Sequence, residues 1–123
     1  MLEQIEIPSK VQIIEDYAFS NVSAQISFAE GSEMTVFAQG CFINYGGSAI
    51  ELPDNILTIQ SLAFSNCPNL SSVTLNSSLV AIDKYAFQNC RNLAEISIPV
   101  SATQIDDEAF YLCDSLVITY EQE

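Results

Sequence analysis

Apolar and polar residues alternate in six short segments that recur along the chain at nearly constant intervals. Each segment reads apolar, polar, apolar, and this period of two predicts a short β-strand with one face buried and its middle residue pointing outward. The six segments are Ile5-Glu6-Ile7, Ile26-Ser27-Phe28, Ile50-Glu51-Leu52, Val73-Thr74-Leu75, Ile96-Ser97-Ile98 and Ile118-Thr119-Tyr120. Stacked on one another, they predict a parallel sheet of six short strands.

Further columns of similar residues follow each strand at the same period. The dipeptide Ala-Phe occupies one column, with cysteine replacing alanine once: Ala18-Phe19, Cys41-Phe42, Ala63-Phe64, Ala86-Phe87 and Ala109-Phe110. Successive first members are 23, 22, 23 and 23 residues apart. Another column reads Val22, Tyr45, Cys67, Cys90 and Cys113. Self-similarity at a period in the twenties is typical of a solenoid, in which only stacked repeats bury a core.

The segments between strands predict the rest of each coil. Residues 55–59 are rich in β-branched side chains and lack helical periodicity, which favours a second extended piece. Residues 83–89 predict one helical turn, in which alanine allows close backbone approach and phenylalanine fills the interior. We therefore expect one domain over residues 1–123, made of about five 23-residue repeats and a closing strand. It could be a complete protein or a fragment of a longer array.

The pattern of residues that recurs in each repeat resembles that of a known family. Leu93-x-x-Ile96-x-Ile98-Pro99, followed by Ile105-x-x-x-Ala109-Phe110-x-x-Cys113-x-x-Leu116, resembles the leucine-rich repeats of the BspA-like (Treponema pallidum) class. The second repeat departs from this pattern, because Phe37 and Cys41 replace Ile and Ala and the segment Ala29-Glu30-Gly31-Ser32-Glu33 is lengthened by two residues. The resemblance implies a right-handed leucine-rich-repeat coil, with a short parallel sheet on its concave face and helical turns or extended segments on its convex side. It also implies adhesion or protein binding in bacterial surface proteins, without shared catalytic residues.

Charge and composition narrow the function. Sixteen acids against three bases give a net charge of −13, so anionic partners such as nucleic acid or acidic membranes are disfavoured. No apolar run is long enough to insert in a membrane, and the N-terminus does not resemble a signal peptide. Histidine, the commonest general base, is absent. We therefore predict no enzyme activity, although paired carboxylates leave a hydrolase as an alternative.

Three sets of recurring residues could form metal, redox or recognition sites, but a structural role explains each of them more simply. The cysteines lack Cys-x-x-Cys spacing, which favours a buried row of small thiols over a metal or redox site. The acids of Asp106-Asp107-Glu108 favour capping of a short helix, with calcium binding left open. Asparagines at 21, 44, 66 and 89 favour left-handed backbone at the end of each turn. No cofactor or metal is therefore predicted.

The concave sheet face is the predicted binding surface. Its candidate contact residues are Gln4, Glu6, Gln25, Ser27, Glu51, Ser72, Thr74, Glu95, Ser97 and Thr119. They are polar and mildly acidic, which favours a basic protein partner, from a host or from a bacterial surface. A structural spacer without its own ligand is the alternative. We expect the parent protein to be secreted or at the cell surface. The edge strands could pair with a partner, and the oligomeric state stays open.

Overall fold

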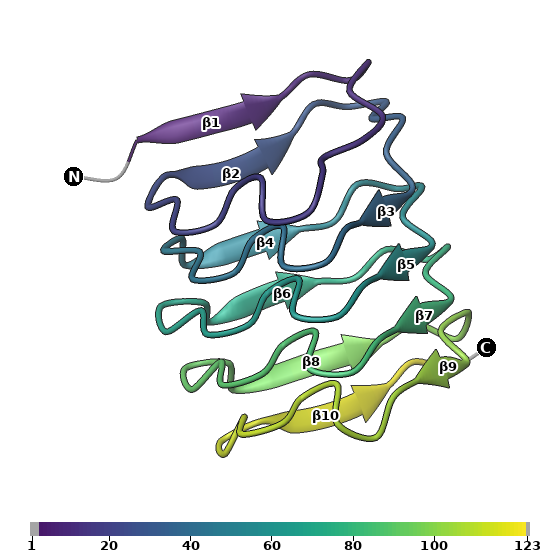
Figure 1. Ribbon diagram of the computed structural model, residues 1–123. Coiled ribbons are helices and arrows are strands. Elements are labelled where there is room, and N and C mark those ends of the chain that lie inside the picture. Colours follow the sequence, from purple (N-terminus) through teal and green to yellow (C-terminus); the bar gives the residue numbers. More distant parts are fainter. Residues whose placement is uncertain (1–2, 123) are drawn as a thin grey trace.

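The structure, a computed structural model that describes residues 3–122, contains ten short β-strands (Figure 1). Six of them coincide with the predicted strands: β1 (Gln4–Ile7), β2 (Gln25–Phe28), β4 (Ala49–Glu51), β6 (Ser72–Thr74), β8 (Glu95–Ile98) and β10 (Val117–Tyr120). The others are two-residue strands: β3 (Val36–Phe37), β5 (Thr58–Ile59), β7 (Ala81–Ile82) and β9 (Gln104–Ile105). The predicted second extended piece is thus confirmed.

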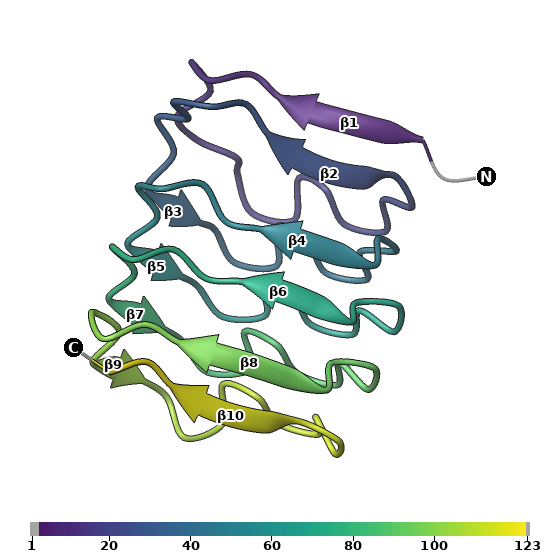
Figure 2. The same ribbon diagram turned by 180° about the vertical axis from the view of Figure 1, so that it is seen from behind.

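The chain winds into a stack of coils, and its strands lie in two rows (Figures 1 and 2). The six longer strands form one row, and β3, β5, β7 and β9 form the other. The first and last strands, β1 and β10, lie at opposite ends of the stack. All paired strands are parallel, and Ile5 lies opposite Ile26, as Ile50 lies opposite Val73. The solenoid architecture and the in-register repeats are therefore confirmed.

Hydrogen bonding divides the row of longer strands. The short strands form one continuous four-stranded sheet, whereas the longer strands join only in the pairs β1–β2, β4–β6 and β10–β8. Within residues 3–122, no backbone hydrogen bond joins β2 to β4 or β6 to β8. The six strands stack in parallel as predicted, but two interruptions separate them into three pairs.

The helical turns expected on the other side of the coil are wrong, because the described residues contain no helix. In residues 83–89 the N–H of Gln88 donates to the Tyr85 carbonyl (3.1 Å), closing a tight turn. The N–H of Phe87 instead donates to the Ala109 carbonyl of the next repeat (2.8 Å). Alternate amides thus bond within the turn and between repeats, so the i→i−4 bonds of a helix do not form. Tyr85 also has a φ of 63°, which a right-handed helix excludes.

A column of stacked phenylalanines fills the interior, as predicted. The ring centroids of Phe42 and Phe64 lie 5.2 Å apart, and those of Phe64 and Phe87 lie 5.1 Å apart. Phe19 and Phe110 continue the column towards the two ends of the coil. The in-register repeat places the rings in offset stacks, an arrangement that contributes beyond the area it buries.

The asparagine column confirms its predicted role at the end of each turn. Asn21, Asn44, Asn66 and Asn89 have φ values between 59° and 63°. Their side chains also form a ladder, in which each amide donates to the carbonyl oxygen of the preceding asparagine over 2.6–2.9 Å. Leu112 occupies the same place in the last repeat, with a φ of 64°. There the Arg91 Nε donates to Asn89 in place of a fifth asparagine (2.6 Å).

Candidate binding face

The outward side chains of the longer strands form what we call the long-strand face. The structure places all ten sequence-predicted contact residues on its strands: Gln4 and Glu6 on β1, Gln25 and Ser27 on β2, Glu51 on β4, Ser72 and Thr74 on β6, Glu95 and Ser97 on β8, and Thr119 on β10. Nine of them are exposed and Gln25 is half-buried. Alternation along each strand explains this, because the intervening residues of β2, β4, β6 and β8 are buried, while Ile5 and Ile118 of the two terminal strands stay exposed.

The strand register brings these residues together in rows. Glu6 lies opposite Ser27, and Glu51 lies opposite Thr74. At the end of the row Ser97 lies opposite Thr119, and the Ser97 hydroxyl bonds to the Glu121 carboxylate (3.3 Å). The result is a row of polar side chains in which carboxylates and hydroxyls alternate from Glu6 to Thr74 and hydroxyls continue to Thr119.

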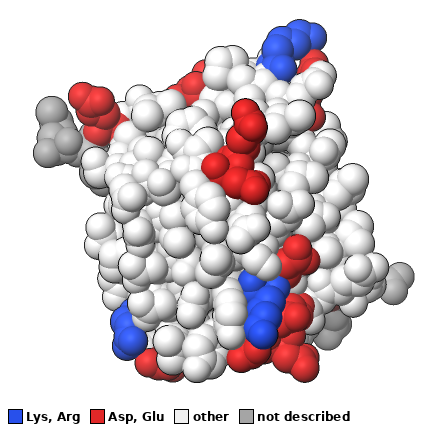
Figure 3. All heavy atoms as spheres, in the orientation of Figure 1, with Lys and Arg blue, Asp and Glu red and all other residues white. Residues whose placement is uncertain are grey.

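The positive charges of the chain lie elsewhere. All three of its cations are in ion pairs: Lys10 with Glu33 (3.2 Å), Lys84 with Glu108 (3.3 Å) and Arg91 with Asp114 (3.5 Å). In Figure 3 the blue side chains correspondingly lie beside red ones. None of the six cation and acid partners belongs to a longer strand. The acids of the long-strand face therefore have no cation partner among the described residues.

Two hollows open on this face where the strand pairs are not joined. We call these places the β2–β4 seam and the β6–β8 seam. The hollow at the β2–β4 seam has a volume of about 560 Å³, and its lining includes the acids Glu30, Glu51 and Asp54. The hollow at the β6–β8 seam measures about 390 Å³ and includes Glu95 and Glu121. Neither hollow is lined by lysine or arginine in the part of the chain that the structure describes.

A tyrosine hydroxyl replaces backbone pairing at the β2–β4 seam. The backbone N–H of Ile26 donates to Tyr45 Oη (2.8 Å), and this hydroxyl lies 3.3 Å from the Ala49 carbonyl, to which it donates. In a parallel ladder the Ile26 amide would bond directly to a carbonyl of the neighbouring strand. Tyr45 has no exposed surface, and its burial raises the pKa of the phenol, so the hydroxyl keeps its proton.

Sequence reasoning did not identify Tyr45 as a structural wedge. It stands in the column that holds Cys67 and Cys90, and it is followed by Gly46 and Gly47. A side-chain carbon on Gly47 would collide with the Tyr45 hydroxyl, so only glycine leaves room for the ring. The glycine pair was thus the available signal, since a glycine in a strand-flanking position often marks close approach of another group.

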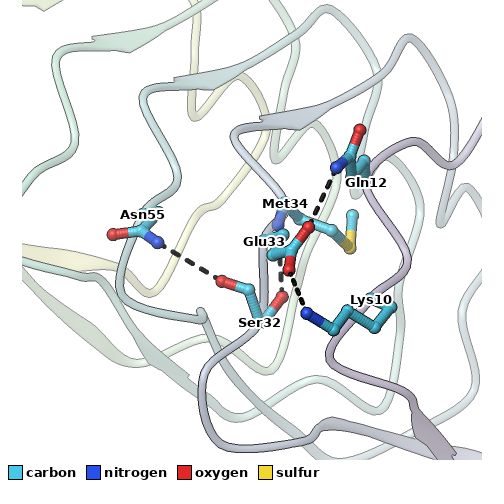
Figure 4. Close-up of polar contacts among 6 residues, drawn as sticks. All are labelled: Lys10, Gln12, Ser32, Glu33, Met34 and Asn55. Atoms are coloured by element: carbon cyan, nitrogen blue, oxygen red, sulfur yellow. Dashed lines mark hydrogen bonds and ion pairs between the residues drawn. The ribbon is translucent and has the colours of Figure 1, made fainter.

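The longer loop of the second repeat is held from both sides (Figure 4). Glu33 accepts hydrogen bonds from Lys10 (3.2 Å) and Gln12 (2.9 Å) of the first repeat. The Gln12 bond, followed by the Lys10 contacts, lowers the pKa of the Glu33 carboxyl. On the opposite side the amide of Asn55 donates to the Ser32 carbonyl (3.3 Å). The inserted residues are therefore tied into the stack beside the β2–β4 seam.

The cysteines are largely buried, as predicted, both in the column of Cys67, Cys90 and Cys113 and at Cys41 of the Ala-Phe column. Cys41, Cys67 and Cys90 are buried free thiols, and Cys113 is half-buried. The Cys90 and Cys113 thiols donate to the carbonyls of Phe64 (3.1 Å) and Phe87 (2.9 Å). Contact with the Cys90 thiol, together with burial, raises the pKa of Cys113. Burial raises the pKa of Cys41 to about 12. The Cys41 and Cys113 thiols therefore stay protonated at neutral pH.

Two of the three acids at residues 106–108, Asp106 and Glu108, have local partners. The Asp106 carboxylate accepts the backbone N–H of Glu108 (2.9 Å), and Glu108 pairs with Lys84. Asp106 thus stabilises a turn, while the helix that it was expected to cap does not form. Among residues 3–122 no group of three or more acids and cysteines is arranged to hold a metal ion.

A family model describes the repeats directly. The model for the BspA type leucine rich repeat region matches six copies over residues 1–117. The chain belongs to this leucine-rich-repeat family. Membership confirms the resemblance drawn from the repeat frame, and the family and its fold are typically non-catalytic.

Solved bacterial leucine-rich-repeat proteins share the fold of this family member. One from Eubacterium ventriosum is 29% identical, with a TM-score of 0.81 over 98% of this chain and 32% of its own. Another, from Bacteroides ovatus, is 24% identical, with a TM-score of 0.72 over 98% of this chain and 38% of its own. A "leucine rich cell surface protein" from Faecalibacterium prausnitzii is 21% identical, with a TM-score of 0.51 over 99% of this chain and 48% of its own.

The chain therefore spans about a third of the length of the first two of these proteins. No curated protein matches its sequence. Within the described residues there is no helix of the length and apolarity needed to cross a bilayer.

Proposed function

We propose that this leucine-rich-repeat domain is a non-catalytic protein-binding module that engages a basic partner through the long-strand face. The observation that carries the proposal is the separation of charge. Glu6, Glu51 and Glu95 project from this face, while every lysine and arginine is paired with an acid outside it. Uncompensated charge on a solenoid face favours encounter with an oppositely charged partner.

The location of the protein is part of the same proposal. We propose that the parent protein is secreted or displayed at the cell surface, where a host or bacterial surface protein would meet this face. The support is the name of the Faecalibacterium prausnitzii protein with the same fold, which describes it as a cell surface protein. An adhesion role fits this setting.

A structural spacer is the second candidate. Its support is that the Eubacterium ventriosum protein is about three times as long as the matched region, so a stretch of this size can be a minor part of a longer array. A spacer would have no ligand on the long-strand face, whereas a binding module would. The two candidates therefore differ in a measurable way.

The test compares charge reversal on two sides of the coil. The face variant carries Glu6→Lys, Glu51→Lys and Glu95→Lys, and the control carries Glu15→Lys, Asp16→Lys and Asp107→Lys at exposed positions outside the longer strands. Both change the net charge by the same amount. Binding is measured by fluorescence anisotropy on a panel of labelled 15-residue peptides that vary in lysine and arginine content.

For a binding module, wild type should bind a subset of the basic peptides. The face variant should lose at least tenfold in affinity, and the control should stay within about threefold. Equal losses in both variants would mean that only the overall charge matters, and an absence of binding by wild type would favour the spacer.

A further inference from the structure

The two seams of the long-strand face differ from the rest of the stack in leaving backbone groups of neighbouring strands unjoined. The backbone amides of Gln25 and Ala29 donate to Glu3 and Ile7, on the β1 side. Because successive backbone N–H groups along a strand point to opposite sides, the N–H groups of Ile26 and Phe28 point towards β4. The Ile26 N–H donates to the Tyr45 hydroxyl instead, and β2 makes no backbone hydrogen bond to β4 within the described chain. The floor of the hollow thus has polar backbone groups in addition to its acids.

The Tyr45 ring and the Gln25 side chain keep the β2–β4 seam in this state. The Gln25 side-chain oxygen accepts the N–H of Ser48 (2.6 Å), so a second side chain stands where backbone pairing would occur. The Tyr45 hydroxyl and the Gln25 side-chain oxygen both lie against Gly47, whose position leaves no space for a side-chain carbon. The seam is therefore formed by specific side chains of the second repeat and its neighbours. Glu51 and Asp54 line the hollow that opens there.

The β6–β8 seam repeats the same chemistry. Glu95 and Glu121 line its hollow together with the hydroxyls of Ser72, Thr74 and Ser97. As at the first seam, no cation lines it within the described residues. Each hollow thus offers carboxylate and hydroxyl oxygens to a group that donates hydrogen bonds and carries positive charge. Guanidinium and ammonium groups meet both requirements.

The spacing of the seams sets a second condition on the partner. Strands β4 and β6 lie between them and pair directly with each other. With neighbouring strands roughly 4.8 Å apart, the two seam centres are separated by about 10 Å along the stack. A polyproline II segment presents the same face every three residues, over about 9 Å. An extended strand presents the same face every two residues, over only about 6.6 Å.

We propose that the two seams are paired subsites for basic side chains three residues apart in an extended, polyproline II-like segment that runs across the strands. This inference rests on the proposed function and adds a partner class to it. The occupant of the long-strand face would be a basic linear segment of a protein, with one cationic side chain in each hollow. Charge complementarity favours this occupant over a second copy of the acidic chain, which would be repelled.

Two labelled peptides of equal charge test the spacing. One has arginines three residues apart in a proline background, PPRPPRPP, and the other has them two residues apart, PPRPRPPP. Affinity for wild type is measured by fluorescence anisotropy at low ionic strength, where exposed charge interactions are least screened. We expect the three-residue spacing to bind at least tenfold more tightly.

Single substitutions then locate the subsites. Glu51→Gln in the first seam and Glu95→Gln in the second should each weaken binding of PPRPPRPP about tenfold and remove the preference for its spacing. Glu15→Gln is the matched control, because Glu15 is an exposed acid outside the longer strands and lines neither hollow. It should change affinity less than threefold. Circular dichroism confirms that the variants fold.

The possible results separate this inference from the function on which it rests. Equal affinity for the two spacings overturns the paired subsites while face-dependent binding of basic peptides survives. A loss with Glu15→Gln as large as with Glu51→Gln also overturns them, because overall charge would then decide the affinity. If the face variant with three lysines binds the basic peptides as well as wild type, both the inference and the proposed function are overturned.

Discussion

We call the side of the coil that carries the tight turns, such as residues 83–89, the turn side. There, backbone hydrogen bonds between repeats continue from the first repeat to the last, whereas on the long-strand face they stop at two seams. The amides of Phe19, Phe42, Phe64 and Phe87 each donate to a carbonyl of the following repeat over 2.6–2.9 Å. The phenylalanine and asparagine columns run along the same continuous stack. The contacts that hold successive repeats together are therefore concentrated on the turn side. The long-strand face can differ from repeat to repeat without loss of the fold.

The largest effect should follow removal of a ring from the phenylalanine column. Phe64→Ala opens a cavity beside Phe42 and Phe87 and should lower the free energy of unfolding by about 3–5 kcal/mol. Urea denaturation measures it. Thr74→Ala, at an exposed position of the long-strand face, is the control and should cost less than about 0.5 kcal/mol. Similar losses in the two variants would contradict the division of roles between the two sides.

Alkaline pH should weaken the turn side through Cys41. Burial raises its pKa from 9.0 to about 12, so between these values the folded state keeps a proton that the unfolded state loses. Stability is therefore complete below pH 9 and falls by about 1.4 kcal/mol per pH unit above it. Cys41→Ala introduces the residue that Ala63 provides in the next repeat. From pH 8 to 10.5, wild type should lose about 2 kcal/mol more than this variant in urea denaturation. Parallel losses would refute the effect.

A smaller loss is expected at the β2–β4 seam. Tyr45→Phe keeps the ring but removes the hydroxyl between Ile26 and Ala49, leaving a buried amide without its partner. The free energy of unfolding should fall by about 1–2 kcal/mol. Tyr120→Phe, at an exposed tyrosine, should leave it unchanged. A neutral Tyr45→Phe would show that the seam does not depend on this relay.

The smallest effect is a gain on the turn side. Leu112 has a φ of 64° where the preceding repeats have asparagine, which tolerates this backbone better. Leu112→Asn should raise the free energy of unfolding by about 0.5–1 kcal/mol and extend the asparagine ladder beyond Asn89. Leu112→Gln, which has an amide but no such backbone preference, should give no gain. Thermal denaturation can compare the three proteins.

Sequence periodicity was sufficient to predict the six longer strands, their register and the buried columns. It also placed the ten contact residues on one face, because alternation alone decides which side chains point outward. It did not predict the form of the turns. Residues 83–89 have the composition of a helical turn, but amides such as that of Phe87 bond to the next repeat, and a single repeat contains no such partner.

By itself, the sequence therefore determined that this protein is a stack of similar coils, because no repeat can bury its apolar residues alone. Only the tertiary structure decided where the stack is interrupted. The β2–β4 seam depends on the Tyr45 ring reaching between two strands, over a glycine that leaves it room. In the sequence Tyr45 is one substitution in a cysteine column. Its consequence arises from the close approach of neighbouring coils, where one larger side chain replaces a backbone bond.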